Sequence, residues 1–320
     1  MKLAQTWCPK LETVNLHIQN VDYQTQMGLQ ENIYLAPDIT LGLRATLTRL
    51  KASGISAESL RSLEYLAANC PRLEIFKLNF AFRNFKEVAL YYTPDIVADS
   101  FGKSTMPFLQ TLHLCDVLGK QLESFSDSPA TDSHPFRDFL LRHPHIKGFK
   151  MGYSAIDTKS PNINPENLAS VFSSLKYFSA PISLCAHLWR STLASRIEYL
   201  NIRPGVWDFE TGFEPLPMPM LRQLRIEHHD HVETLKLMQM VMPVASELEH
   251  LRTEASEFPH AFHTQFLELL THAPKLQTIG IYDFSWYPDS VALVEMIQDE
   301  YPEVDVREEL VWDNWYNDLI

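Results

Sequence analysis

The sequence predicts an α/β solenoid of about ten irregular repeats, each made of a short strand followed by a helix. Three observations lead to this fold class. A short apolar motif recurs along the chain, the spacing of the motif narrows to a regular range, and the segments between motifs carry helix signals. Polar residues between the apolar ones of each motif indicate that one face of every strand is open to solvent.

The motif is a proline or small residue, any residue, and then Φ-x-x-Φ-x-Φ, where Φ is apolar. It is clearest at 9–16, 71–78, 107–114 and 144–151. Weaker members begin at Leu175, Ile197, Leu221, Leu248 and Leu276, a degenerate one contains Leu47 and Leu50, and Val304 and Val306 close the series. Since Φ-x-Φ alternates with a period of two, each motif predicts a short strand with one buried face.

The first apolar residues stand at positions 11, 47, 73, 109, 146, 175, 197, 221, 248, 276 and 304. From 146 onward the steps are 22–29 residues, the range of leucine-rich repeats that carry a helix. We therefore expect a single leucine-rich-repeat solenoid over 1–320, a horseshoe with parallel strands on its concave face and helices on its convex face. Residues 288–320 are expected to form a C-terminal capping segment. The strands are predicted near 14–17, 76–79, 112–115, 149–152, 200–203, 224–227, 251–254 and 279–282.

Helix signals lie between the predicted strands. Residues 56–69 place apolar side chains on one face of a helix, and a second apolar stripe runs from 262 to 273. Asn164 followed by Pro165 predicts an N-cap and a first helical position, and 230–233 predicts a capping box that opens a helix over 234–242.

A doubly wound α/β fold also alternates strands with helices. Its strands are buried on both faces and appear as continuous apolar runs. In this chain polar residues such as Lys77, Lys150 and Arg225 separate the apolar positions, which favours the solenoid.

The junctions at 69–74 (Asn-Cys-Pro-Arg-Leu-Glu) and 272–277 (His-Ala-Pro-Lys-Leu-Gln) resemble those of cysteine-containing leucine-rich repeats, which are common in F-box proteins. The irregular repeat lengths and the closing segment 296–306 look like the repeat regions of fungal F-box/leucine-rich-repeat proteins. The resemblance covers essentially the whole chain. It implies a substrate-recognition module of the SCF ubiquitin-ligase type.

Two features depart from that family. The position eight residues after the first leucine, usually Asn or Cys, holds other residues, for example Ala81, Val117 and Ser256. No F-box is recognisable ahead of the first repeat, so we expect either a truncated chain or a stand-alone binding protein.

Composition narrows the function classes. The formal net charge of −13 argues against a nucleic-acid partner, because the phosphate backbone would repel the chain. No signal peptide and no segment able to span a bilayer are evident, so a cytoplasmic or nuclear location without membrane attachment is expected. The four cysteines form no C-x-x-C pair, which suggests neither a zinc site nor a disulfide framework.

No motif for catalysis stands out. Gly102-Lys103-Ser104-Thr105 mimics the end of a P-loop but lacks its first glycine, and the cluster 227–231 (Glu-His-His-Asp-His) is expected to splay at a turn. We therefore expect no catalytic residues, no metal and no cofactor, and predict that the chain is not an enzyme. The alternative is a cytosolic enzyme or enzyme-regulating repeat protein whose site lies in the long insertions 81–106 or 116–133. A further long insertion spans 19–46.

The predicted functional surface is the concave face formed by the polar positions of the strands. Its middle positions carry cations although the chain is acidic, and tyrosines lie beside them. The expected partner is a protein, with an acidic or phosphorylated segment, bound by a monomer or within a hetero-complex. The candidate partner-binding residues are Lys77, His113, Lys150, Tyr177, Tyr199, Asn201, Arg203, Arg225, Arg252 and Tyr282.

Overall fold

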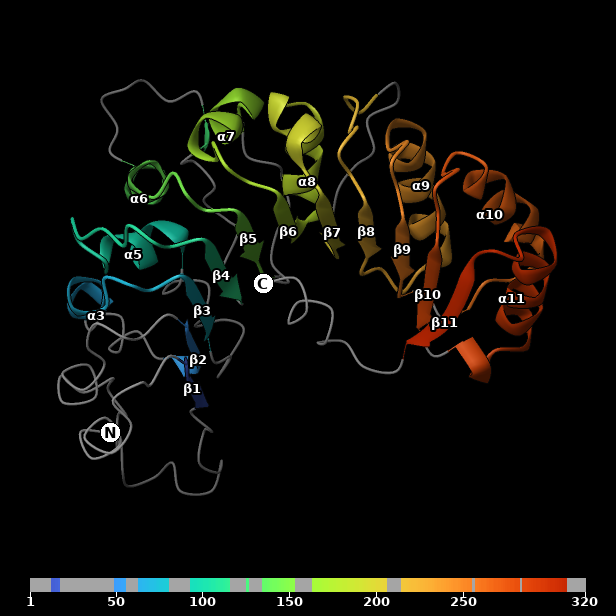
Figure 1. Cartoon of the computed structure of the whole chain (residues 1–320), viewed down its shortest axis with the longest axis horizontal. Helices are drawn as coiled ribbons and strands as arrows, with labels where there is room; N and C mark the ends of the chain where they lie inside the picture. Colours follow the sequence, from blue (N-terminus) through green and yellow to red (C-terminus); the bar gives the residue numbers. More distant parts are fainter. Residues whose placement is uncertain are drawn as a thin grey trace. The chain divides into compact units, whose positions relative to one another are not determined.

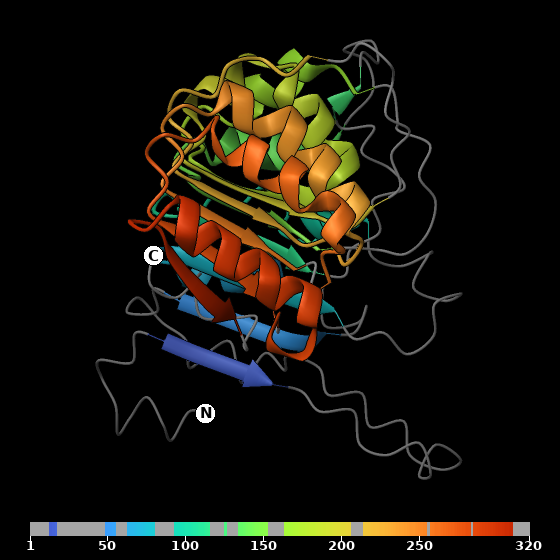
Figure 2. The same ribbon diagram turned by 90° about the vertical axis from the view of Figure 1, so that its right-hand side faces the viewer.

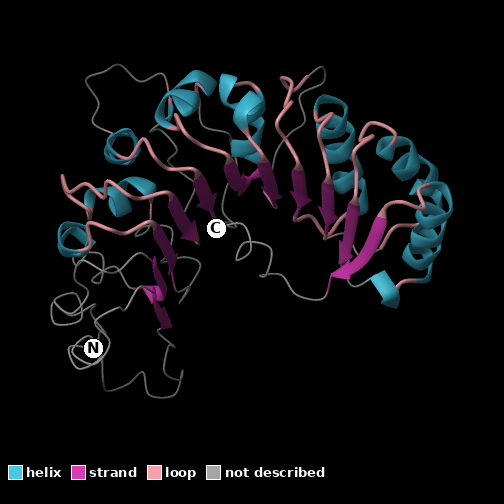
Figure 3. Ribbon diagram, in the orientation of Figure 1, coloured by secondary structure: helices cyan, strands magenta, loops and turns pink. Residues whose placement is uncertain are grey.

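The structure, a computed structural model, describes residues 13–17, 49–55, 63–80, 93–115, 125–126, 134–152, 163–205, 214–254, 257–282 and 284–309. The chain divides into two compact units. Unit 1 comprises 1–187 with 205–207, and unit 2 comprises 188–204 with 208–320. Within each unit, a layer of parallel strands lies against helices that cover one of its faces (Figure 1, Figure 3).

In unit 1 each strand pairs in parallel with the next strand along the chain, from β1 to β6. The strands are β1 (Thr13–His17), β2 (Arg49–Ile55), β3 (Ile75–Phe80), β4 (Thr111–Cys115), β5 (Gly148–Met151) and β6 (Tyr177–Pro181). The helices are α3 (Leu63–Asn69), α5 (Pro94–Asp99), α6 (Pro135–Arg142) and α7 (Pro165–Val171), and the boundary between the units falls within α8 (Ile182–Trp189).

Unit 2 repeats the arrangement, and Figure 2 shows its helices stacked beside one another on one side of the strands. Its strands, again paired in parallel in chain order, are β7 (Tyr199–Arg203), β8 (Gln223–Ile226), β9 (His250–Thr253), β10 (Thr278–Tyr282) and β11 (Asp305–Glu309). The α-helices are α9 (His231–Val241), α10 (His263–Leu270) and α11 (Pro288–Glu300). The 3₁₀ helices are η3 (Thr192–Arg196), η4 (Met242–Val244), η5 (His260–Phe262) and η6 (Phe284–Trp286).

The apolar motif forms the core of both units. In the repeat that begins at Leu221 all three apolar positions are buried, since Leu221, Leu224 and Ile226 are each 0% exposed. Leu73 and Leu109 are likewise 0% exposed, and Leu276 is 8% exposed. The predicted leucine-rich-repeat register and the parallel pairing are therefore confirmed, and each predicted strand lies within two residues of an observed one.

The repeat junctions are closed by the backbone. At six of the described junctions, one carbonyl just before a strand accepts two N–H groups from the following repeat. The Glu74 carbonyl accepts from Gln110 N at 2.8 Å and from Thr111 N at 2.9 Å, and the Arg222 carbonyl accepts from the amides of residues 249 and 250 in the same way. These bonds satisfy polar groups that would otherwise be costly to bury.

Two predicted helix N-caps are observed. The Asn164 Oδ1 atom accepts from Glu166 N at 2.8 Å, and Pro165 is the first residue of α7. The Asp230 Oδ1 atom accepts from Val232 N at 2.8 Å and from Glu233 N at 3.0 Å. The boundary prediction was wrong here, because α9 begins at His231 rather than at 234. In a capping box, the amide of the N-cap residue would donate to the side chain three residues later, here Glu233. The Asp230 amide donates to His228 Nδ1 instead, at 3.3 Å.

The insertions are only partly described. Part of 81–106 is helical, since it contains α5, capped by Thr93; 81–92 lie outside the described residues. In 116–133 only Phe125 and Ser126 are described. Phe125 is 0% exposed, with its ring centroid 6.0 Å from that of Phe136. The insertion 19–46 lies outside the described residues, and so do 310–320 of the expected capping segment. In the described part of the chain, none of the helices has the length and apolarity needed to cross a bilayer.

Candidate partner-binding surface

The strand face of each unit is the side of its strands that points away from the helices. Strand side chains alternate between two sides, so this face receives every second residue. In unit 2 the register places Asn201 opposite Arg225, and Arg225 opposite Arg252. Gly280 and then Arg307 continue this middle row.

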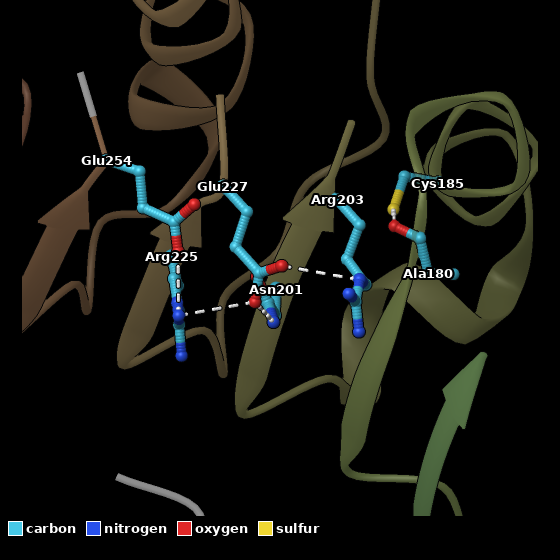
Figure 4. Close-up of polar contacts among 7 residues, drawn as sticks. All are labelled: Ala180, Cys185, Asn201, Arg203, Arg225, Glu227 and Glu254. Atoms are coloured by element: carbon cyan, nitrogen blue, oxygen red, sulfur yellow. Dashed lines mark hydrogen bonds and ion pairs between the residues drawn. The ribbon is translucent and has the colours of Figure 1, made fainter. Parts of the chain in front are cut away.

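Arg225 of this row belongs to an ion-pair network within unit 2, and the charge of Arg252 acts on Glu254 of the same network. Figure 4 shows Arg225 between two carboxylates: its Nη2 atom lies 2.7 Å from Glu254 Oε1 and 3.4 Å from Glu227 Oε1. The Glu227 carboxylate also accepts from Asn201 Nδ2 at 2.7 Å and lies 3.3 Å from Arg203 Nε. Glu227 and Glu254 each follow a strand by one residue, which brings their side chains beside the arginine row.

The network is buried. Asn201 is 0% exposed, Arg252 1% and Arg225 3%. The expectation that solvent reaches this face of every strand is therefore wrong for these three residues. A charge in such a place is tolerated only when it is paired and hydrogen-bonded, and Glu227 and Glu254 supply pairing for Arg225.

Burial shapes the ionisation of the network. It raises the pKa of Glu254 to about 7, the negative charge of Glu227 adds to the effect, and Arg225 and Arg252 oppose it. For Arg225, burial alone would lower the pKa, but the charge of Glu227, together with Tyr199 and Glu254, outweighs it and raises the pKa. Burial also raises the pKa of Tyr199 to about 12. Glu254 is therefore the carboxyl of this network that protonates near neutral pH.

The strand face of unit 1 has a different charge balance. Its middle row pairs Lys77 with His113 and His113 with Lys150, on three neighbouring strands. Lys51 of β2 stands in register opposite Lys77. Lys77 and Lys150 are half-buried, whereas His113 is 4% exposed. No Asp or Glu occupies a strand-face position in β1 to β6, the described strands of this unit.

The structure thus separates the predicted surface residues into two groups. Lys77, His113, Lys150 and Tyr177 lie on the strand face of unit 1. Tyr199, Asn201, Arg203, Arg225, Arg252 and Tyr282 lie on that of unit 2. Tyr199 is buried, while Tyr177, Arg203 and Tyr282 are half-buried.

Two features of these faces were missed from the sequence. Lys51 was overlooked because its repeat has a degenerate motif. The neutralising carboxylates had a visible signal: Arg-x-Glu occurs at equivalent positions of two consecutive repeats, as Arg225-Ile226-Glu227 and Arg252-Thr253-Glu254.

The described residues also include potential metal ligands and two buried thiols, those of Cys70 and Cys185. No group of three or more His, Cys, Asp or Glu there is arranged to hold a metal ion. The Cys185 thiol is fully buried and donates to the Ala180 carbonyl at 3.4 Å (Figure 4), and burial raises its pKa. Burial also raises the pKa of Cys70, to about 11. Neither thiol has the low pKa of a nucleophilic cysteine.

Fold and junction geometry define this chain as an α/β protein with leucine-rich-repeat architecture. No family model matches it, and neither does any of the curated proteins searched. Among solved structures, it is similar to a chain in the crystal structure of the Rad7 and Elc1 complex in yeast. The identity is 13% and the TM-score 0.35, and the match covers 84% of this chain and 83% of the other. A likeness this distant says nothing about what the present chain binds.

Proposed function

We propose that this chain is a protein-interaction module that holds a partner polypeptide on the strand face of its repeats and catalyses no reaction itself. The observation that carries the proposal is the row of basic residues on unit 1, formed by Lys77, His113 and Lys150 on adjacent strands of an acidic chain. Adjacent strands in a parallel sheet present such side chains at regular intervals, which suits an extended or irregular peptide.

The finer form of the proposal is a substrate-recognition module of the SCF ubiquitin-ligase type, bound to an acidic or phosphorylated segment. The junction sequences at 69–74 and 272–277 support it by their resemblance to F-box-associated repeats. The lysines of this row support the choice of an anionic partner, because lysine ammonium groups bind carboxylates and phosphates.

Site-specific photocrosslinking in native cells tests the proposal. A benzophenone amino acid replaces Tyr177, which lies half-buried on the strand face of unit 1, and in a matched variant it replaces Asp138, exposed on α6. We expect a saturable crosslink to a polypeptide from position 177 and none from position 138. Crosslinks from position 138 alone, or none from either position, would refute the proposal.

Mass spectrometry of the co-purified proteins tests the finer form. Adaptor and cullin subunits of a ubiquitin ligase, recovered in stoichiometric amount, would support the ligase assignment. A crosslinked partner recovered without any ligase subunit would remove that assignment and leave the interaction module in place.

A further inference from the structure

We infer that His260 and His263 form a site for one divalent transition-metal ion, with Zn²⁺ the ion that fits best, at the start of α10 in unit 2. The inference goes beyond the proposed function and does not depend on it, because both histidines lie in helical turns and outside the strands. It rests on the positions of the ring nitrogens and of the groups that they contact.

The Nδ1 atoms of the two rings face each other. His260 Nδ1 lies 3.3 Å from His263 Nδ1, and the ring planes are inclined at 61°, so the rings are not stacked face to face. In a tetrahedral zinc site with Zn–N bonds of about 2.05 Å, two ligand nitrogens are about 3.3 Å apart. In a square-planar site, typical of Cu²⁺, neighbouring nitrogens would be only about 2.9 Å apart. The separation therefore fits tetrahedral coordination.

The Nε2 atoms, on the other side of the rings, each contact an oxygen atom. His263 Nε2 lies 2.8 Å from the Phe258 carbonyl oxygen, and His260 Nε2 lies 3.2 Å from Asp289 Oδ1. A carbonyl or a carboxylate only accepts hydrogen bonds, so each Nε2 atom carries a proton and donates it. Histidines that bind a metal usually have this support, which fixes the tautomer and leaves the other nitrogen for the ion. The sequence predicted no metal, because the pair alone supplies two ligands and the supporting Asp289 belongs to the next helix.

A cation between the two Nδ1 atoms completes the arrangement. When both Nε2 atoms carry protons, a neutral pair has two nitrogen lone pairs that point at each other, which is repulsive. The cation is either a proton, which makes one ring an imidazolium, or a metal ion bound by both rings. A shared proton would draw the nitrogens closer than 3.3 Å, because charge-assisted hydrogen bonds are short. The observed separation therefore favours the metal ion.

The groups that orient the histidines come from two consecutive repeats. Asp289 lies in the first turn of α11, and the next residue, Ser290, accepts a hydrogen bond from Phe258 N at 2.9 Å. His263 is 2% exposed, whereas the His260 side chain is 67% exposed, so solvent reaches the site from the side of His260. Water completes the coordination. Because the ion binds only the folded arrangement, it stabilises the protein.

The test measures Zn²⁺ binding to the full, metal-free chain by isothermal titration calorimetry at pH 7. The test variant is His260→Gln, at an exposed position where the fold tolerates the change. The matched control is His145→Gln/His272→Gln, which removes two exposed histidines, one in each unit. We expect the wild-type chain to bind one equivalent of Zn²⁺. The test variant should lose about tenfold or more in affinity and the control less than about threefold.

A second variant tests the support of the ligand. Asp289→Asn keeps the size of the side chain but removes the carboxylate that accepts from His260 Nε2. Loss of such a support costs about 10- to 100-fold in metal affinity, so we expect Zn²⁺ to bind at least about tenfold more weakly. Zn²⁺ should also raise the urea midpoint of the wild-type chain and leave that of His260→Gln unchanged. Circular dichroism confirms that all variants fold.

Three results would overturn the inference. No saturable binding of Zn²⁺ by the wild-type chain would show that a proton alone lies between the rings. Equal losses in His260→Gln and in the control would show adventitious binding to surface histidines. An unchanged affinity in Asp289→Asn would show that the carboxylate does not orient a metal ligand. The crosslink from position 177 tests the proposed function separately, so none of these results decides it.

Discussion

Truncating Leu224 to alanine is expected to destabilise the protein strongly. Leu224 is 0% exposed in the middle of β8, between Leu200 of β7 and Leu251 of β9, which are also 0% exposed. The change removes about three buried carbon atoms, which accounts for about 2.4 kcal/mol of transfer free energy. The cavity left between two well-packed neighbours adds to this, so we expect a loss of about 3–4 kcal/mol in the free energy of unfolding.

The measurement is urea-induced unfolding followed by far-ultraviolet circular dichroism. The matched control is Leu216→Ala in the same unit, where the leucine is 42% exposed, and it should cost less than about 1 kcal/mol. The dependence of the free energy on urea should be the same in all variants, so that a shift in midpoint reports stability alone. If Leu224→Ala costs no more than Leu216→Ala, the assignment of the apolar motif to the core is mistaken.

Three further predictions concern ionisation. Burial lowers the pKa of His143 below its ordinary value of 6.5, so the free energy of unfolding should fall as the pH drops below about 6.5, and His143→Gln should flatten this dependence in acid urea titrations. The pKa of Glu254 is raised to about 7, so its contribution to stability is complete below pH 4.5 and is lost as the pH rises through 7; Glu254→Gln should lose less stability than wild type between pH 5 and 8. A carboxyl ¹³C resonance of Glu254 with a midpoint near pH 4.5 would contradict that account. Burial raises the pKa of both Cys70 and Cys185, so iodoacetamide should alkylate these thiols far more slowly in the native chain than in urea. Mass spectrometry measures the modification, and rapid alkylation of the native chain would show that the thiols are accessible.

The arginine network of unit 2 illustrates why a row of equal charges in a sequence is weak evidence for a binding site. Arg225 and Arg252 satisfy the positional criterion for the predicted surface, and so do Lys77 and Lys150. For Arg225, sequence position does not reveal the carboxylates that reach it across strands: Glu254 is 29 residues away along the chain but 2.7 Å away in space. Removing one partner of such a pair leaves a buried charge without a counter-ion, and this cost is the main effect of the pair on stability.

Much of the fold was determined by the sequence itself. The period-two alternation of residues such as Phe76 and Leu78 identifies the buried face of a strand, and the helix caps at Asn164 and Asp230 depend on bonds to residues two or three places away. These are local interactions, so a pattern within about ten residues contains them. The helix start was predicted three residues too late, because an N-cap at Asp230 makes His231 the first helical residue.

The charge state and accessibility of the strand face were decided only by the tertiary structure. Whether Arg225 is available to a partner depends on Glu227 and Glu254, and whether Lys51 stands opposite Lys77 depends on the pairing of β2 with β3. Composition and spacing locate such residues on a face, but they do not state which side chains of neighbouring repeats meet. Electrostatic interactions act through space and depend on burial, so the surroundings of a cation on a strand follow from the folded structure and not from its place in the motif.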